Sequence, residues 1–309
     1  AGAVRLWEGT GSFYESPRLA SFLARFNYVY DGKYLLTANA RADASSKVGE
    51  NNRWGFFPST SLAWILSEEG FLKDVSFLNN LKLRAGYGVS GNLGAIDSYN
   101  SLQLMKPNGV VSVNGAPTVT MGVIRNANPD LKWEVKRTFN VGLDAGFFQN
   151  RLILAADYYH AKTTDMLYLY DVSVPPFAYN KLLANLGSME NSGVELGLGI
   201  TPLQKKDMEL NINVNVAFQK NKLLSLSGMY NGQYMSAPQY TPIASLNGAG
   251  FHGGNNHIVY QIVGESLGVF YLPHCTGLVE QADGSYRYEV ADLNGNGVNL
   301  EDGEDRYVA

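Results

Sequence analysis

The residues best suited to chemistry lie in an acidic, glycine-rich segment near the C-terminus. Asp292, Asn294 and Asn296 occupy the first, third and fifth positions of a calcium-binding loop, and the glycine that makes its sharp turn comes next. Val298 would supply its backbone carbonyl, but the final position, where a bidentate acid is expected, is Gly303. The segment therefore predicts either a Ca²⁺ site or a solvated acidic turn. In a longer loop the missing acid would be one of four residues: Glu301, Asp302, Glu304 or Asp305.

The sequence also holds a formal match to the G-x-S-x-G pattern of a serine nucleophile, from Gly264 to Gly268. That nucleophile needs a strand before it and a helix after it, whereas the residues that follow this motif have the apolar character of a strand. We interpret the motif as a turn or the entry to a strand. The sequence shows no other set of residues with the spacing of a catalytic site, so we expect that the protein is not an enzyme. The histidines lack metal-ligand spacing, and we interpret them as loop or lumen residues: His160, His252, His257 and His274.

Composition excludes some classes of protein. The chain has 309 residues and a formal net charge of -4, so it lacks the excess of positive charge that would indicate a nucleic-acid partner. Its single cysteine, Cys275, permits no intrachain disulfide. No stretch holds the roughly 18 consecutive apolar residues of a membrane helix. The sequence shows no signal peptide and begins at Ala1, which favours a fragment or a processed product.

The elements that would position functional residues are β-strands, and the clearest is Met208–Phe218. Its even positions are apolar and its odd positions from Glu209 to Asn215 are polar, and a period of two indicates a strand with two unlike faces. In a soluble sheet the apolar face would pack on a core, and in an outer-membrane barrel it would face lipid. We expect Leu210, Ile212, Val214 and Val216 to point outward and Asn211, Asn213 and Asn215 to point inward.

The same alternation recurs over about 16–221 and within 258–290, and the connections between strands are alternately short and long. Short turns on one rim and long loops on the other are typical of outer-membrane barrels. The alternatives are a soluble β-sandwich or β-solenoid, but the strands exceed the ~5–6 residues usual in sandwiches, which favours the barrel. Short turns are predicted at 31–32, 149–150 and 204–207, and long extracellular loops at about 91–129, 169–189 and 222–256.

Charged residues of both signs occupy the polar positions of these strands. We expect most of them to pair with one another, which would leave a polar lumen without a funnel of a single sign. The set comprises Arg25, Arg41, Lys82, Arg84 and Lys136 and the acids Asp43, Glu134, Asp144, Glu195 and Glu209.

Several motifs, in the same order along the chain, resemble those of one family. They include Gly49-Glu-Asn-Asn-Arg-Trp-Gly-Phe-Phe-Pro58, Leu81-Lys-Leu-Arg-Ala-Gly-Tyr-Gly-Val-Ser-Gly-Asn92, Asn128-Pro-Asp-Leu-Lys-Trp-Glu134, Asn191-Ser-Gly-Val-Glu-Leu196 and Asp292-Leu-Asn-Gly-Asn-Gly297. With these motifs the chain resembles the SusC/RagA family of TonB-dependent outer-membrane transporters over nearly its whole length. The resemblance implies an all-β fold, an antiparallel up-and-down transmembrane barrel of about twenty-two strands. Residues 1–309 would form part of that barrel domain.

Nothing in the chain matches the family's plug domain or its TonB-contacting segment, so the resemblance implies a sector of the barrel wall. A sector has unpaired backbone groups along both edges unless other strands cover them. We therefore expect the first strand, near Arg18–Tyr30, and the last strand, within 258–290, not to pair with each other.

The resemblance further implies a nutrient importer in the cell outer membrane, surrounded by lipid. Its partners would be a SusD-like surface lipoprotein and, through segments outside this chain, the TonB–ExbB–ExbD system. The cargo implied is an oligosaccharide or an oligopeptide, and no residue identifies which. Two other functions stay open, an outer-membrane barrel enzyme such as a protease or lipase, and a passive porin or adhesin. Ca²⁺ is the one cofactor that the sequence suggests.

Overall fold

The computed structural model describes residues 14–245, 257–297 and 306–308. Within these residues the chain forms seventeen strands and two short 3-10 helices, η1 (Glu50–Asn52) and η2 (Leu66–Glu68). No helix in this described part is long and apolar enough to cross a membrane. The fold is therefore all-β, as predicted.

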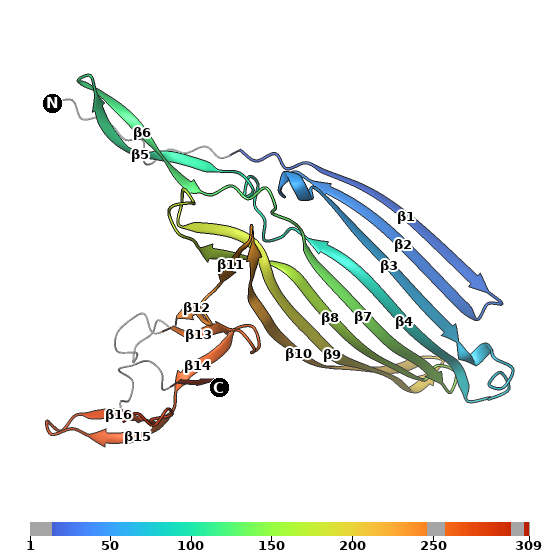
Figure 1. The fold of residues 1–309 in the computed structure, drawn as a ribbon. Helices are drawn as coiled ribbons and strands as arrows, with labels where there is room; N and C mark the ends of the chain where they lie inside the picture. The colour runs from blue at the N-terminus through green and yellow to red at the C-terminus, as the bar shows by residue number, and fades with distance from the viewer. Residues whose placement is uncertain (1–13, 246–256, 298–305, 309) are drawn as a thin grey trace.

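Nine strands form one large antiparallel sheet, in which most neighbours in space are also neighbours in the chain (Figure 1). Most of these strands exceed the ~9–11 residues that a tilted strand needs to cross a bilayer, and the longest has 25 residues. In order across the sheet they are β1 (Leu19–Tyr30), β2 (Tyr34–Ser45), β3 (Trp54–Ile65), β4 (Leu78–Asn92), β7 (Glu134–Phe147), β8 (Leu152–Asp171), β9 (Lys181–Lys205), β10 (Met208–Tyr230) and β11 (Gln233–Ser236).

The register of the sheet aligns apolar residues with apolar residues. One row of directly paired residues crosses eight strands: Tyr28, Leu36, Leu62, Ala85, Val141, Tyr158, Val194 and Phe218. The adjacent row points to the other side, and it is polar or small: Asn27, Thr37, Ser61, Gly86, Asn140, Tyr159, Gly193 and Gln219. The sheet therefore has an apolar face and a polar face, as side chains alternate along every strand.

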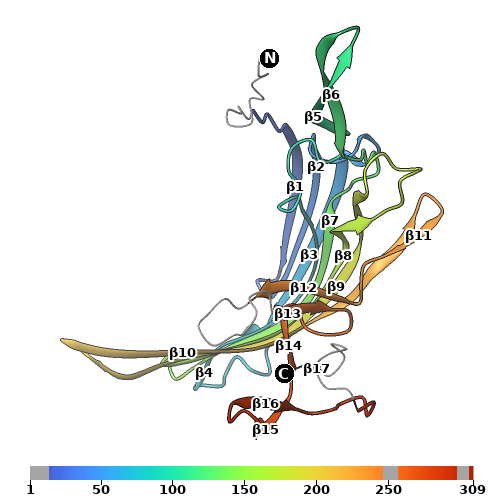
Figure 2. The same cartoon turned by 90° about the vertical axis from the view of Figure 1, so that its left-hand side faces the viewer.

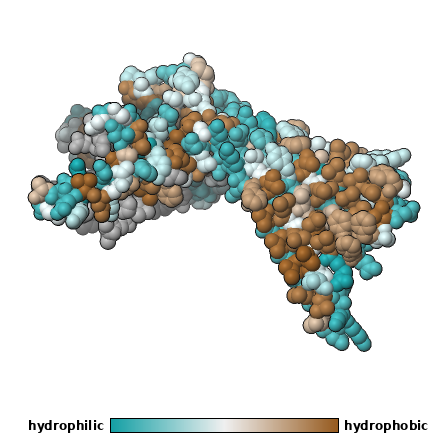
Figure 3. All heavy atoms as spheres, turned by 90° about the horizontal axis from the view of Figure 1, so that it is seen from below, coloured by the Kyte–Doolittle hydropathy of each residue, from teal (hydrophilic) through white to brown (hydrophobic). Residues whose placement is uncertain are grey.

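The apolar face is not covered by other parts of the described chain. Val214 is 47% exposed, and it lies on the same side as Leu210, Ile212 and Val216, opposite the asparagines between them. Figure 3 shows the apolar side chains as a broad brown area over the sheet. An uncovered apolar face of this size fits lipid contact rather than a closed soluble core, which confirms the predicted orientation of β10.

The sheet is open at both edges. β1 pairs with β2 alone, and β10 pairs with β9 along its length but with β11 only over Ser227–Tyr230. No strand of the described C-terminal part pairs with β1, so the expectation of two separate edges is confirmed. Figure 1 shows the curved sheet with β1 and β10 at opposite sides.

The predicted division into a short-turn rim and a long-loop rim is also found. The β1–β2, β7–β8 and β9–β10 turns lie at one end of the sheet, on the lower right of Figure 1. The connection after β3 lies at the same end but is longer, because it includes η2 and residues up to the start of β4.

The boundaries of the long loops differ from those predicted. Segment 91–129 holds a hairpin of β5 (Leu104–Val113) and β6 (Ala116–Arg125), and 169–189 is strand except for residues 172–180. Segment 222–256 holds the end of β10, β11 and the strand β12 (Tyr240–Ser245).

Two Asn-Gly dipeptides explain much of this difference. Asn114-Gly115 and Asn231-Gly232 have positive φ at both residues, which is the geometry of a tight hairpin turn. Both dipeptides fall within the segments expected as long loops, although Asn-Gly between apolar runs is a strong hairpin signal.

β8, β9 and β10 share an irregularity where they leave the regular part of the sheet. The β8–β9 register shifts between Thr164 and Met166, opposite Ser188 and Gly187. The β9–β10 register shifts between Leu223 and Ser225, again opposite this part of β9. We call this line of bulges across the three strands the crease.

The C-terminal strands do not continue the large sheet, although strands were predicted there. β12 joins β13 (His257–Ile262), β14 (Val269–Pro273) and β17 (Arg306–Val308) in a four-stranded sheet. β15 (Cys275–Glu280) and β16 (Tyr286–Val290) form a separate hairpin. Figure 1 shows both sheets across the molecule from β1, and Figure 2 shows the β15–β16 hairpin at the bottom of the view.

Aromatic residues gather around a single carboxylate at the short-turn rim. Glu69 Oε1 accepts hydrogen bonds from the Tyr34 hydroxyl at 2.7 Å and from Trp64 Nε1 at 2.9 Å. The rings of Tyr34 and Trp64 stack with centroids 6.1 Å apart, and Tyr30 packs against Tyr34. This arrangement suits a membrane interface, where an aromatic ring lies in an apolar layer and its polar group reaches water.

The first prediction concerns the apolar face. A Val214→Lys substitution should lower the free energy of unfolding by about 2–4 kcal/mol, because it places a charge against lipid. Urea unfolding of the full-length protein in lipid vesicles would measure this change. Asn213→Lys is the matched control, since its side chain lies on the polar face, and it should have little effect. Equal losses of stability in both variants would contradict the assignment of the faces.

The second prediction concerns pH. The hydrogen bonds from Tyr34 and Trp64 lower the pKa of Glu69 below its usual value. A lowered pKa contributes stability that is present above the usual carboxyl range and is lost as the pH falls through the folded-state pKa. Backbone hydrogen exchange in residues 66–77 should therefore accelerate between about pH 5 and about pH 3, after correction for intrinsic rates. Glu69→Gln should remove this acid dependence, whereas Glu68→Gln should retain it.

Candidate functional site

The polar face of the sheet carries an ion-pair network at its centre. Arg84 on β4 forms a bidentate pair with Asp144 on β7, with N–O distances of 2.8 and 2.9 Å. The same guanidinium contacts Asp157 on β8 at 3.0 Å. Gly142 lies between these groups, where a Cβ atom would collide with both Arg84 and Asp157. The network therefore needs glycine at this position, and it joins three neighbouring strands.

The expectation that most of the named charges pair with one another is met only in part, because within the described residues Arg84–Asp144 and Arg41–Asp43 are the ion pairs that the set forms. Arg41 and Asp43 form an ion pair within β2 at 2.6 Å. Glu134 accepts hydrogen bonds from the Asn92 side chain and from the backbone of Leu167. The face is thus polar and of mixed sign, which suits passage of a hydrophilic solute without selection for one charge.

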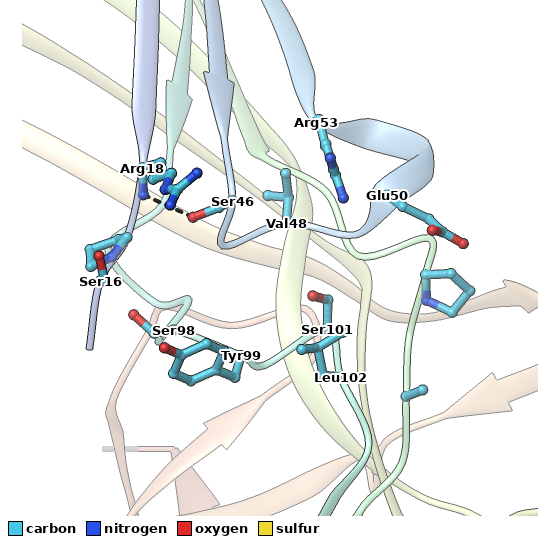
Figure 4. Close-up of a pocket in the computed structure, with 13 residues that line it drawn as sticks. Ser16, Arg18, Ser46, Val48, Glu50, Arg53, Ser98, Tyr99, Ser101 and Leu102 are labelled. Atoms are coloured by element: carbon cyan, nitrogen blue, oxygen red, sulfur yellow. Dashed lines mark hydrogen bonds between the residues drawn. The ribbon is translucent and has the colours of Figure 1, made fainter. Parts of the chain in front are cut away.

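A cavity of about 610 Å³ lies at the long-loop rim, where four separate segments meet (Figure 4). We call it the rim pocket. Its walls come from the residues just before β1, the link between β2 and β3, the loop after β4 and the residues after β6. Its polar or charged lining residues are Ser16, Arg18, Ser46, Glu50, Arg53, Ser98, Tyr99 and Ser101.

Hydrogen bonds to backbone carbonyls between two of the family-like motifs build one wall of the rim pocket. Gly49 donates from its backbone N–H to the Leu131 carbonyl at 2.7 Å, and Asn52 donates from its side chain to the Asp130 carbonyl at 3.0 Å. A Cβ atom at Gly49 would collide with the backbone of Pro129. The glycine therefore permits the close approach of the two segments.

Below these contacts lies a small apolar core. It comprises Val48, Phe57, Ile96, Leu131 and Trp133, each at most 7% exposed. Val48 also lines the rim pocket, whereas Phe57 and Trp133 line a second cavity of about 470 Å³ that reaches Arg41 and Asp43 on the polar face. The core thus fixes the loops at the edge of the polar face.

Three buried asparagines connect the rim loops to β8–β9. Asn126 donates to the carbonyls of Tyr179 and Lys181, and Asn128 donates to the Leu183 carbonyl. Asn185 bonds both the N–H and the carbonyl of Lys132. Sequence reasoning missed these residues because an asparagine that bonds a distant backbone looks the same as one in a solvated loop.

The predicted calcium ligands form a compact turn. Asp292 accepts backbone hydrogen bonds from Gly295, Asn296 and Gly297, and Asn294 Oδ1 accepts one from Asn296. The oxygens are thus directed into the turn, and Val298 lies outside the described residues. Calcium binding by Asp292, Asn294, Asn296 and Val298 stays a prediction. Among the residues that the structure describes, no group of three His, Cys, Asp or Glu is placed to hold a metal ion.

The G-x-S-x-G motif forms a turn between β13 and β14. Ser266 donates to the Asn221 carbonyl at 3.0 Å, and the Asn221 side chain accepts from the backbone of Leu267. A strand follows instead of a helix, so the interpretation as a turn is confirmed. His160 was expected in a loop or the lumen, but it lies in β8 and pairs with Phe139 on the apolar face, which corrects that interpretation.

Comparisons with known proteins agree with this geometry. The sequence matches the family described as TonB dependent receptor-like, beta-barrel over residues 5–304. It is 38% identical over 231 residues to TonB-dependent receptor P39 of Formosa agariphila, an alignment that covers 73% of this chain and 22% of the relative. It is 35% identical over 218 residues to TonB-dependent receptor SusC of Bacteroides thetaiotaomicron, covering 70% of this chain and 22% of that protein.

Solved structures show the same fold. The RagAB peptide importer in its open-open state matches with a TM-score of 0.70 and 26% identity, over 89% of this chain and 28% of that one. The structure of the RagAB peptide transporter matches with a TM-score of 0.68 and 28% identity, over 85% and 26% of the two chains.

The chain belongs to the TonB-dependent receptor β-barrel family, and within it resembles SusC and RagA. The large sheet is accordingly a sector of an outer-membrane barrel, with the apolar face toward lipid and the polar face toward the lumen. The chain spans 22% of the length of the two relatives named above.

The third prediction concerns the central ion pair. In a double-mutant cycle of Arg84→Met and Asp144→Asn, the two residues should show a coupling energy of about 1 kcal/mol, because the pair is bidentate but partly solvated. Urea unfolding of the four full-length proteins would measure it. The pair Lys82 and Asp144 serves as the control, and it should couple more weakly. A coupling energy near zero for Arg84 and Asp144 would contradict the network.

Proposed function

We propose that the whole protein is the outer-membrane component of a TonB-dependent nutrient importer. It would take up oligosaccharides or oligopeptides together with a SusD-like surface lipoprotein. The observation that carries this proposal is the register of the large sheet, which gives eight strands a continuous polar face behind a continuous apolar face. Such a wall encloses a hydrophilic path through lipid.

The similarity to the RagAB peptide importer supports an oligopeptide cargo, and the oligosaccharide is the class that the family resemblance implies. The energy would come from the proton-motive force through the TonB–ExbB–ExbD system, and the cargo would cross without covalent change. The protein would then not be an enzyme. In support, Ser266, the serine of the one nucleophile-like motif, donates its hydrogen bond to a backbone carbonyl within a turn.

The fourth prediction tests transport in cells. Disruption of the full-length gene should abolish uptake of one labelled oligosaccharide or oligopeptide from a panel, and the intact gene should restore it. Removal of TonB should abolish the same uptake, because an energised importer depends on it. Uptake that persists without TonB would instead identify a passive porin. Recovery of cleaved cargo from purified protein would identify an enzyme.

A further inference from the structure

The rim pocket contains cationic groups that the described chain leaves without partners. Arg18 and Arg53 both line it, and among residues 14–245, 257–297 and 306–308 neither guanidinium has a hydrogen-bond or ion-pair partner. Glu50 also lines the pocket, but its carboxylate points away from Arg53 in Figure 4. An arginine that is not engaged by its own chain is available to an anionic ligand.

Ser98 adds a second, independent observation. Its side chain is 8% exposed and lines the same cavity, and its hydroxyl has no hydrogen-bond partner within the described part of the chain. Buried hydroxyl groups in folded proteins almost always have a partner, because leaving one unsatisfied costs about 1–3 kcal/mol. The hydroxyl oxygen itself is almost inaccessible, so its side chain must turn toward the cavity before a ligand can accept its hydrogen bond.

We propose that the rim pocket binds a carboxylate group of the transported oligomer through Arg18 and Arg53, with Ser98 as a further hydrogen-bond donor. This inference rests on the proposed function and adds the chemistry of the cargo. A guanidinium offers two parallel N–H groups at the spacing of a carboxylate's oxygens, so a planar acid is its best-matched partner. The cavity volume of about 610 Å³ suits the terminal unit of an oligomer.

The position of the pocket fits a role in capturing cargo. It lies at the long-loop rim, beside the apolar core that separates it from the cavity over the polar face. An oligomer anchored there by one acidic end would be held at the outer rim, with its remaining units outside the pocket. The carboxylate has two natural sources, the C-terminus of a peptide and a uronic acid of an oligosaccharide.

Four probes distinguish these sources. The first pair is penta-alanine and its C-terminal amide, and the second is tri-galacturonate and its methyl ester. Equilibrium binding of each would be measured on the full-length transporter purified in detergent. In one pair the free acid should bind about ten-fold or more tightly than its neutral partner. The pair that shows this preference identifies the source of the carboxylate.

Substitutions at the two arginines test the site itself. Arg18→Gln and Arg53→Gln should each remove most of the preference for the acid while leaving the affinity for the neutral probe unchanged. Ser98→Ala should reduce the preference by a smaller factor. Arg25→Gln is the matched control, because Arg25 lies on the polar face of β1 outside the pocket and bonds Asn27. It should retain the full preference.

Three results would overturn the inference. They are equal binding of acid and neutral probes in both pairs, no binding of any of the four probes, and an acid preference that survives both arginine substitutions. In each case, cellular uptake that still requires TonB would leave the proposed function standing. Loss of the TonB requirement would instead reject the proposed function, whatever the pocket binds.

Discussion

The structure depends on one constraint, that every backbone N–H and C=O inside a bilayer must have a hydrogen-bond partner. A β-strand meets it only through its neighbours, so the wall is built from long antiparallel strands, most of them joined to the next strand along the chain. Because side chains alternate along each strand, such a wall has one face toward lipid and the other toward the lumen. The same constraint explains the two open edges, which strands outside this chain must cover.

Outside the bilayer the requirement that strands pair all backbone groups no longer holds, and the segments of the rim are held together by other contacts. There the segments are joined by side chains that bond backbone groups far away in the sequence, such as Asn126 and Asn128. These bonds hold the residues after β6 against the start of β9, while Lys47 Nζ donates to the Ile96 carbonyl and joins the link between β2 and β3 to the loop after β4. The rim pocket and the small apolar core beneath it are products of that packing, so the proposed cargo site depends on contacts that the barrel strands alone would not create.

The sequence was most informative where one physical rule governs. The alternation of residue types predicted the strands, their faces and the short turns. A repeat of two residues is directly visible in a sequence as alternating apolar and polar residues. The family-like motifs predicted the class of barrel. The predicted boundaries of the long loops were wrong where Asn114-Gly115 and Asn231-Gly232 turn strands back on themselves, although Asn-Gly is a local signal for such a turn.

The rim pocket could not have been predicted in the same way. Arg18, Arg53 and Ser98 lie up to 80 residues apart in the numbering, and no local pattern relates them. Their proximity follows from the non-local packing of the rim. The same holds for Gly142, whose necessity becomes visible only when Arg84 and Asp157 are placed beside it.

The crease across β8, β9 and β10 has a mechanical meaning. A regular ladder of hydrogen bonds resists bending, whereas bulges interrupt the ladder and allow the strand direction to change. Because the register shifts of β8 and β10 face the same short part of β9, the three strands change direction there together. The outer ends of these strands therefore leave the lipid-embedded part of the sheet together, as one panel. The crease thus sets the angle at which this side of the rim leans, and with it the width of the mouth that the rim surrounds.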